Sequence, residues 1–171
     1  MADAQKGLVV AQQDMLAMKL SEHFTLAEMT RTSTGLPNVP PESALPLVRE
    51  LCEKVLEPVR DKWGPLRITS GYRSPAVNSA VGGSATSSHV WSEDSVACDF
   101  QSIQARLEDV FEWLRLESSL DFDQAILEYG RLPDSTRDDC IHIGFRSHNP
   151  RRLAMVGQTN NRSKYQYVEV V

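Results

Sequence analysis

The stretch from Cys140 to Phe145 constrains the fold most, because apolar and polar residues alternate along it. Successive side chains of a β-strand point to opposite faces, so Ile141, Ile143 and Phe145 share one face. His142 lies on the other face, with a glycine beside it to leave space. The apolar face is expected to enter a core, and His142 is expected to face a cleft. The chain should therefore contain a sheet with one buried side and one open side.

A second histidine and an acid lie close together much earlier, in the stretch Ser87–Phe100. His89 follows a Ser/Gly-rich loop, and Asp99 lies in an apolar run over residues 96–101 that predicts another strand. If the two strands are adjacent, they present Asp99 and His142 to one metal, and His89 reaches in from the loop. Two imidazoles and a carboxylate form a three-ligand set for zinc with a fourth position left for water. That arrangement is typical of catalytic zinc sites rather than structural ones.

Other histidines and cysteines are weaker candidates for this site. His23 and His148 have no carboxylate at an informative spacing, and most single histidines lie on the surface or are hydrogen-bonded in a core. Cys98 is expected to face the core. Cys140 shares the face of His142 and stays open as a competing soft ligand.

Two further residues have both a functional interpretation and a purely structural one. Asp139 precedes His142 by three residues, and a base is needed to take a proton from an activated water and return it to a leaving group. Asp138 is the neighbour most easily confused with it, and the alternative is a solvated charged turn. Arg73 is suited to polarise a substrate carbonyl or to hold a substrate carboxylate, and its alternative is a surface salt bridge.

The rest of the chain predicts an α+β fold with a small, mostly antiparallel sheet and helices packed on one side. Helices come first and most strands come later, without βαβ alternation. Residues 1–20 form an N-terminal arm and residues 21–171 a single domain. Helices are expected after the capping box of residues 25–28, over residues 42–62 with a kink or break at Pro58, up to residue 81, and over 106–116. Strands are expected over residues 66–70, 96–101, 123–129, 140–145 and 165–171.

Composition excludes several classes of protein. A length of 171 residues fits one domain, and the net charge of -5 favours neither nucleic acid nor a membrane surface as the partner. Three cysteines without close spacing predict a chain made in a reducing compartment rather than a disulfide framework. The N-terminus lacks the pattern of a secretory signal, and no apolar run is long enough to cross a membrane.

An ordered series of short motifs resembles a known family. The chain is similar to the zinc D-alanyl-D-alanine carboxypeptidase family, which includes phage L-alanyl-D-glutamate endolysins and has the hedgehog/DD-peptidase fold. The segments Leu20–Glu28 and Leu56–Arg60 look like its phage-encoded branch. The motifs that carry the resemblance are Ser70-Gly71-Tyr72-Arg73-Ser74, Asn78 with Val81-Gly82-Gly83, Ser88-x-His89, Ala97-x-Asp99 and Asp139-x-x-His142.

The resemblance implies a role for each matching residue. It makes Asp139 the general base and Arg73 the residue that polarises the carbonyl and binds substrate. Ser88 lies where the family keeps a small polar residue beside the first ligand, so we expect it to contact substrate. The implied reaction is hydrolysis of a peptide bond in peptidoglycan stem peptides. The implied zinc ligands are His89, Asp99 and His142.

The sequence departs from the family pattern between the first two proposed ligands. The family usually has six residues between the histidine and the aspartate, and this chain has nine, Val90 to Cys98, with acidic Glu93 and Asp94 among them. The extra residues are expected to form a longer loop, to crowd the cleft, or to bind a second cation such as calcium.

Two functions from different classes follow from the resemblance. The first is a wall-degrading zinc peptidase of a phage, made in the cytoplasm without a signal peptide. It would act on the cell wall either at lysis or as a virion component. The second is a catalytically weak or inactive structural or binding virion protein that keeps the fold, with virion or tail proteins as partners.

Overall fold

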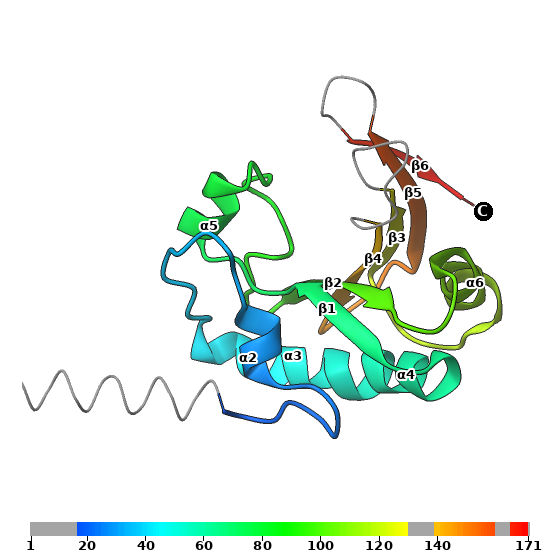
Figure 1. The fold of residues 1–171 in the computed structure, drawn as a ribbon, viewed down its shortest axis with the longest axis horizontal. Coiled ribbons are helices and arrows are strands. Elements are labelled where there is room, and N and C mark those ends of the chain that lie inside the picture. The colour runs from blue at the N-terminus through cyan, green and yellow to red at the C-terminus, as the bar shows by residue number, and fades with distance from the viewer. Residues whose placement is uncertain (1–16, 130–138, 160–164, 171) are drawn as a thin grey trace, which may run out of the picture.

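A computed structural model of the chain describes residues 17–129, 139–159 and 165–170. Its centre is one six-stranded sheet in the order β1-β2-β4-β3-β5-β6, so the predicted α+β class is confirmed (Figure 1). Neighbouring strands are antiparallel except for β3 and β5, which are parallel. The strands are β1 (Leu66–Ser70), β2 (Ser95–Ser102), β3 (Gln124–Glu128), β4 (Cys140–Arg146), β5 (Leu153–Thr159) and β6 (Tyr165–Glu169).

Short helices surround this sheet. In Figure 1, α3 and α4 run along one side of β1 and β2, whereas α5 lies on the other side. Among the described residues, no helix combines the length and the apolar character needed to cross a bilayer. The helical segments are α2 (Leu26–Thr30), η1 (Glu42–Ala44), α3 (Leu45–Leu51), η2 (Cys52–Leu56), α4 (Glu57–Trp63), α5 (Pro75–Ala80), α6 (Leu107–Glu112) and η3 (Trp113–Glu117).

Local sequence signals explain where the helices begin and change. The predicted capping box is formed at α2: the Thr25 hydroxyl accepts from the Glu28 amide at 3.3 Å, and the Thr25 amide donates to the Glu28 carboxylate at 3.0 Å. The predicted kink at Pro58 takes the form of a π-helical turn, η2, between α3 and α4. Because proline has no amide hydrogen, it cannot continue the regular pattern of helix bonds. The Glu57 amide accordingly donates five residues back, to the Cys52 carbonyl.

The core lies between the sheet and α3, α4 and α6. Phe100 of β2 and Ile141 and Ile143 of β4 are fully buried on this side. Their strand neighbours Asp99 and His142 alternate with them and therefore stand on the opposite face. The sequence-based assignment of the β4 faces is thus confirmed, and the open face is free to form a cleft.

Strand β5 was not predicted from the sequence. It pairs in parallel with β3, Ala125 opposite Ala154, and antiparallel with β6, Val156 opposite Val168. Both of its neighbours lie in segments that were predicted as strands, β3 within residues 123–129 and β6 within residues 165–171. The weak alternation around Gly157 gave little local signal for a strand, so β5 depends on its two partners for its conformation.

The segment before α2 is fixed to the domain by two kinds of contact. Leu20 and Phe24 are buried in the core, at 1% and 2% exposure. The Glu57 carboxylate of α4 accepts hydrogen bonds from the Ser21 hydroxyl at 2.6 Å and from the His23 amide at 2.8 Å. Residue 20, which the sequence placed in the N-terminal arm, thus packs with the domain. Residues 1–16 of the predicted arm lie outside the described residues.

Asp123 holds three strands together from a buried position. It is 2% exposed, and its amide donates to the Gly144 carbonyl of β4 while its carbonyl accepts from the Leu153 amide of β5. The Arg151 guanidinium binds both carboxylate oxygens, at 2.8 and 2.5 Å, and Arg146 lies at 3.2 Å. Burial opposes ionisation, but the hydrogen bonds and charges of the two arginines hold the pKa of Asp123 below its usual value.

Asp123→Asn should therefore destabilise the fold near neutral pH. A hydrogen bond to a charged group contributes about 1.5–3 kcal/mol, and the free energy of unfolding in urea should fall by roughly that amount. Because the folded-state pKa is lowered, the contribution is present above the unfolded value of 3.8 and is lost as the pH falls through the folded value. Stability of the variant should thus depend less on pH below 3.8 than that of the wild type.

The exposed Asp121 provides a matched control, since Asp121→Asn makes the same chemical change two residues away. Equal losses in the two variants, or an equal acid dependence of Asp123→Asn and wild type, would contradict the role of the Asp123 cluster.

Candidate metal centre and its cleft

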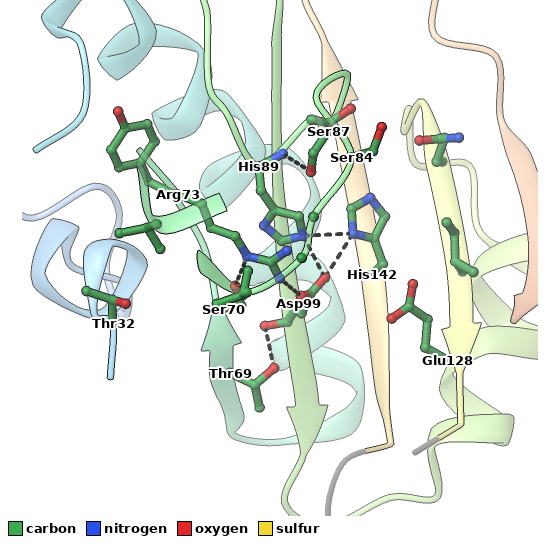
Figure 2. A pocket seen from close by; sticks show the side chains of 18 of the residues that line it. Thr32, Thr69, Ser70, Arg73, Ser84, Ser87, His89, Asp99, Glu128 and His142 are labelled. Carbon is green, nitrogen blue, oxygen red and sulfur yellow. Dashed lines mark hydrogen bonds and ion pairs between the residues drawn. The ribbon is translucent and has the colours of Figure 1, made fainter. Parts of the chain in front are cut away.

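Three side chains from distant parts of the sequence meet on the open face of the sheet. The Asp99 carboxylate oxygen Oδ1 lies 3.0 Å from His89 Nε2 and 2.8 Å from His142 Nδ1, and the two ring nitrogens are 3.2 Å apart (Figure 2). All three residues are buried. They are the one group of three or more His, Cys, Asp or Glu side chains among the described residues whose ligand atoms converge so closely.

Pairing of β2 with β4 brings two members of this group together. Asp99 lies directly opposite His142 in the antiparallel ladder, and both point to the same face. A β-bulge after Ile68 lets Ser70 of β1 also lie opposite Asp99, on its other side. The sheet therefore places one carboxylate between a histidine strand and the start of the segment that carries Arg73.

His89 is oriented by backbone contacts rather than by a strand. Its carbonyl accepts from the Arg73 amide at 2.8 Å, and its ring Nδ1 lies 2.7 Å from the Gly71 carbonyl. A carbonyl can only accept, so Nδ1 carries the hydrogen and Nε2 of the neutral ring keeps a lone pair. That lone pair points at Asp99 and His142, as Figure 2 shows.

The chemistry of this donor set fits a zinc ion. An imidazole lone pair and a carboxylate oxygen at 3.0 Å repel each other unless a proton or a cation lies between them. A tetrahedral zinc bound at about 2.0–2.1 Å holds its ligand atoms roughly 3.3 Å apart. The observed separations of 2.8, 3.0 and 3.2 Å among the three atoms are close to that value. Burial also lowers the pKa of His89, which keeps the ring in its neutral, metal-binding form.

Arg73 binds the second carboxylate oxygen of Asp99. Its Nη2 donates to Asp99 Oδ2 at 3.0 Å and its Nε to the Ser70 hydroxyl at 2.9 Å. Burial opposes ionisation of Asp99, but its contacts with the two imidazoles hold the pKa of Asp99 well below its usual range. Asp99 is thus ionised and has both oxygens engaged, one by the imidazoles and one by Arg73.

The group lies in a cleft of about 720 Å³. Arg73 and Ser88, two of the residues predicted to contact substrate, also line it. Hydroxyl groups are numerous among the lining residues, so the cleft offers many hydrogen-bond donors and acceptors to a polar ligand. The lining residues with a hydroxyl group are Thr32, Ser33, Thr69, Ser70, Tyr72, Ser84, Thr86, Ser87, Ser88 and Tyr167.

The extra residues between His89 and Asp99 form a turn outside the cleft. None of the residues from Val90 to Cys98 lines it. Trp91 is buried, with its ring 5.4 Å from that of Tyr72 and its Nε1 donating to the Ala97 carbonyl at 2.9 Å. The Ser92 hydroxyl closes the turn by accepting from two following amides. The expected longer loop is therefore found, and the expected crowding of the cleft is not.

Asp139, the predicted general base, is not brought to the metal group. It lines a second hollow, of about 560 Å³, together with Tyr129 and residues of α6. Its carbonyl accepts from the Gln101 side chain, which holds the backbone at this end of the sheet. Cys140 also lies outside the converging group, and burial raises the pKa of its thiol. Asp138 falls outside the described residues.

Glu128 is a cleft residue that the sequence analysis missed. It ends β3 on the same face as Ile126, which lies opposite His142. Figure 2 shows its carboxylate pointing toward the metal group from the strand next to His142. The sequence offered one signal for this residue. A single acid ends the segment Gln124–Glu128, two residues after Ile126, which lies opposite His142.

Comparison with known proteins gives one match. A model of the peptidase M15 family matches residues 22–132. The matched segment includes Arg73, His89, Asp99 and Glu128 and ends before Asp139 and His142. No curated protein matches the chain.

Gly71→Ala should disturb the support of His89. A β-carbon at this position would lie 2.1 Å from the Met29 carbonyl oxygen, a backbone atom that accepts the Tyr72 amide at 2.6 Å. Overpacking of this kind costs about 1–3 kcal/mol, so the midpoint of urea unfolding should fall accordingly. Gly144→Ala is the matched control, because its β-carbon would meet Gln124 at an ordinary 3.5 Å. Equal costs at both glycines would contradict the close approach at Gly71.

Zinc binding should depend on the three converging side chains. His89→Ala and His142→Ala should each weaken zinc binding by more than the roughly 10–100-fold that loss of an outer hydrogen-bond partner costs. Zinc content after dialysis and titration calorimetry measure this. His148→Ala, at an exposed histidine outside the cleft, should bind zinc as the wild type does. A wild type that binds no zinc, or full binding in all three variants, would contradict the site.

Proposed function

Since this chain belongs to the peptidase M15 family, we propose that it is a zinc-dependent peptidase that hydrolyses a peptide bond in bacterial peptidoglycan stem peptides. One observation carries the proposal: His89, Asp99 and His142 converge in a cleft of about 720 Å³ lined by many polar side chains. Two imidazoles and a carboxylate are the ligand set of zinc sites that keep a position for water or substrate. The family match and the ligand chemistry thus support the same activity.

Each part of the cleft has a role in this activity. A zinc ion held by the three side chains would polarise a peptide carbonyl and lower the pKa of a bound water. Arg73 lies beside Asp99 and is suited to bind a substrate carbonyl or carboxylate, because its guanidinium carries a fixed positive charge. Ser88 and the neighbouring hydroxyl groups are suited to bind the amides of an extended peptide.

The proposed setting is a bacteriophage. The segments Leu20–Glu28 and Leu56–Arg60 resemble the phage-encoded branch, which supports either a lysis enzyme or a virion-associated wall hydrolase. In both cases the protein is made in the cytoplasm and acts on the cell wall, with the peptidoglycan peptide as substrate. In the virion case, other virion or tail proteins are its partners.

The alternative is a virion protein that keeps the fold without turnover. The features that favoured it were the N-terminal arm and the long segment between His89 and Asp99. That segment, Val90–Cys98, does not line the cleft, so its length gives no physical reason for a loss of activity. The peptidase is therefore the better supported of the two functions.

Cleavage of purified peptidoglycan tests the proposal directly. The zinc-loaded wild type should release peptide fragments that mass spectrometry identifies, and removal of zinc by a chelator should abolish the release until zinc is restored. Release of D-alanine alone would identify a carboxypeptidase, whereas internal fragments would identify an endopeptidase. His148→Ala should retain the activity and His142→Ala should lose it, because His142 belongs to the metal group and His148 does not. Zinc binding without any release by the wild type would favour the non-catalytic alternative.

A further inference from the structure

The cleft has an acid that the proposed metal group does not use. Glu128 ends β3 and lines the cleft, two residues beyond Ile126, which lies opposite His142. Diagonal neighbours of this kind have β-carbons about 7–8 Å apart, so Glu128 stands beside the metal group without joining it. The other acid of the described lining, Asp99, has both oxygens engaged by the imidazoles and by Arg73. Glu128 is therefore available for a separate role.

Glu128 is a half-buried carboxylate without a side-chain cation bound to it. Within residues 17–129, 139–159 and 165–170, no Lys, Arg or His forms an ion pair with Glu128. The Tyr167 hydroxyl donates to Glu128 Oε1 at 3.2 Å, a neutral contact that fixes the carboxylate but does not balance its charge. Burial of a charge costs free energy unless the charge is paired. A cationic group of a ligand would supply that pairing.

Three strands place the ring of Tyr167 next to this carboxylate. Glu128 lies opposite Gly157 of β5, and Gly157 lies opposite Tyr167 of β6, so the three residues point to the same face of the sheet. Because Gly157 has no side chain, Tyr167 can reach across β5 to Glu128. Tyr167 is 48% exposed and lines the cleft, so a ligand can contact its ring. The electron-rich face of a tyrosine ring attracts cations, as the carboxylate does.

Apolar side chains lie between the metal group and this pair. Ile126 of β3 and Met155 of β5 lie opposite each other, and both line the cleft. They form the row next to Glu128 and Tyr167, on the side of His142. An alkyl chain that passes over Ile126 and Met155 would bury its methylene groups and bring its end to Glu128. A lysine-like side chain, with an apolar stem and a charged head, has this form.

The opposite side of the metal group carries positive charge. The strand order β1-β2-β4-β3 separates Arg73, which follows β1, from Glu128 on β3, and Figure 2 shows the two on either side of His142. Arg31 also lines the cleft, and its Nη2 donates to the Ile68 carbonyl of β1 at 3.0 Å. The cleft is thus positive toward β1 and negative toward β3. This polarity would orient a peptide that carries both a carboxylate and an ammonium group.

We propose that Glu128 and Tyr167 form an ammonium-binding subsite, which selects stem peptides whose diamino acid has a free side-chain amine. The side chain of a diamino acid is an alkyl chain that ends in a primary amine, which is positively charged at neutral pH. The chain lies over Ile126 and Met155, and its ammonium group donates to the Glu128 carboxylate and contacts the Tyr167 ring. A cross-link turns this amine into an uncharged amide, so cross-linked stems are the poorer substrates. This specificity rests on the proposed peptidase function and concerns the same cleft.

Two synthetic stem peptides that differ in one charge test the subsite. Both contain lysine as the diamino acid, and in one of them the lysine Nε is acetylated. The zinc-loaded wild type should cleave the free-amine peptide with a kcat/KM at least about tenfold higher, as expected for a hydrogen bond between charged groups. Glu128→Gln should cleave the two peptides about equally, with its loss mainly in KM. Glu53→Gln, at an exposed helical position, should keep the wild-type preference. Comparison of two peptides on one enzyme cancels changes in folding or zinc content.

Peptide binding separates the subsite from the peptidase. Titration calorimetry with zinc-free protein, which does not consume the peptides, should give a lower Kd for the free-amine peptide in the wild type and equal Kd values in Glu128→Gln. Equal cleavage and equal binding of the two peptides by the wild type, or a preference that Glu128→Gln retains, would overturn the subsite while leaving the peptidase intact. A binding preference without cleavage of either peptide would overturn the peptidase and leave the subsite. A wild type that neither binds nor cleaves either peptide would overturn both.

Discussion

The pairing of β2 with β4 is the constraint on which the rest of the structure depends, because its register decides which side chains reach the cleft. Asp99 lies opposite His142, and each is flanked along its strand by apolar residues that enter the core. A slip of one residue would turn His142 inward and bring isoleucines to the open face. Burial of Phe100, Ile141 and Ile143 therefore fixes the register, and the hydrophobic energy that stabilises the sheet also assembles the polar group.

The polar group is held by contacts with other parts of the protein. Gly71 accepts from one side of the His89 ring, and the other side meets Asp99. Arg73 neutralises the far oxygen of that carboxylate. Buried charges are tolerated when they are paired and hydrogen-bonded, and a fixed arrangement needs little reorganisation when a cation or substrate binds. The cleft is thus prepared for a charged ligand before that ligand arrives.

Local patterns predicted the elements whose signal lies within one segment. Alternation predicted the strand Leu66–Ser70 and the strand faces of Asp99 and His142, whereas His89 is positioned from a loop by backbone contacts. Strand β5, Leu153–Thr159, was missed because its conformation depends on two partners, one of them parallel. Alternation places Glu128 on the same strand face as Ile126, but only the register with β4 shows that this face lines the cleft. Asp139 matched a sequence motif, yet it lies just before β4 and lines another hollow.

The turn between His89 and Asp99 has a consequence for engineering of the protein. The turn is anchored at its base: Trp91 packs on Tyr72, and the Ser92 hydroxyl closes the turn, while Glu93 and Asp94 are exposed. Exposed turn tips of this kind are the positions where proteins best accept inserted sequence. A peptide epitope or a dye-labelling site grafted between the two acids would stand away from the cleft. The same separation lets this chain carry its long connection without moving the three converging side chains.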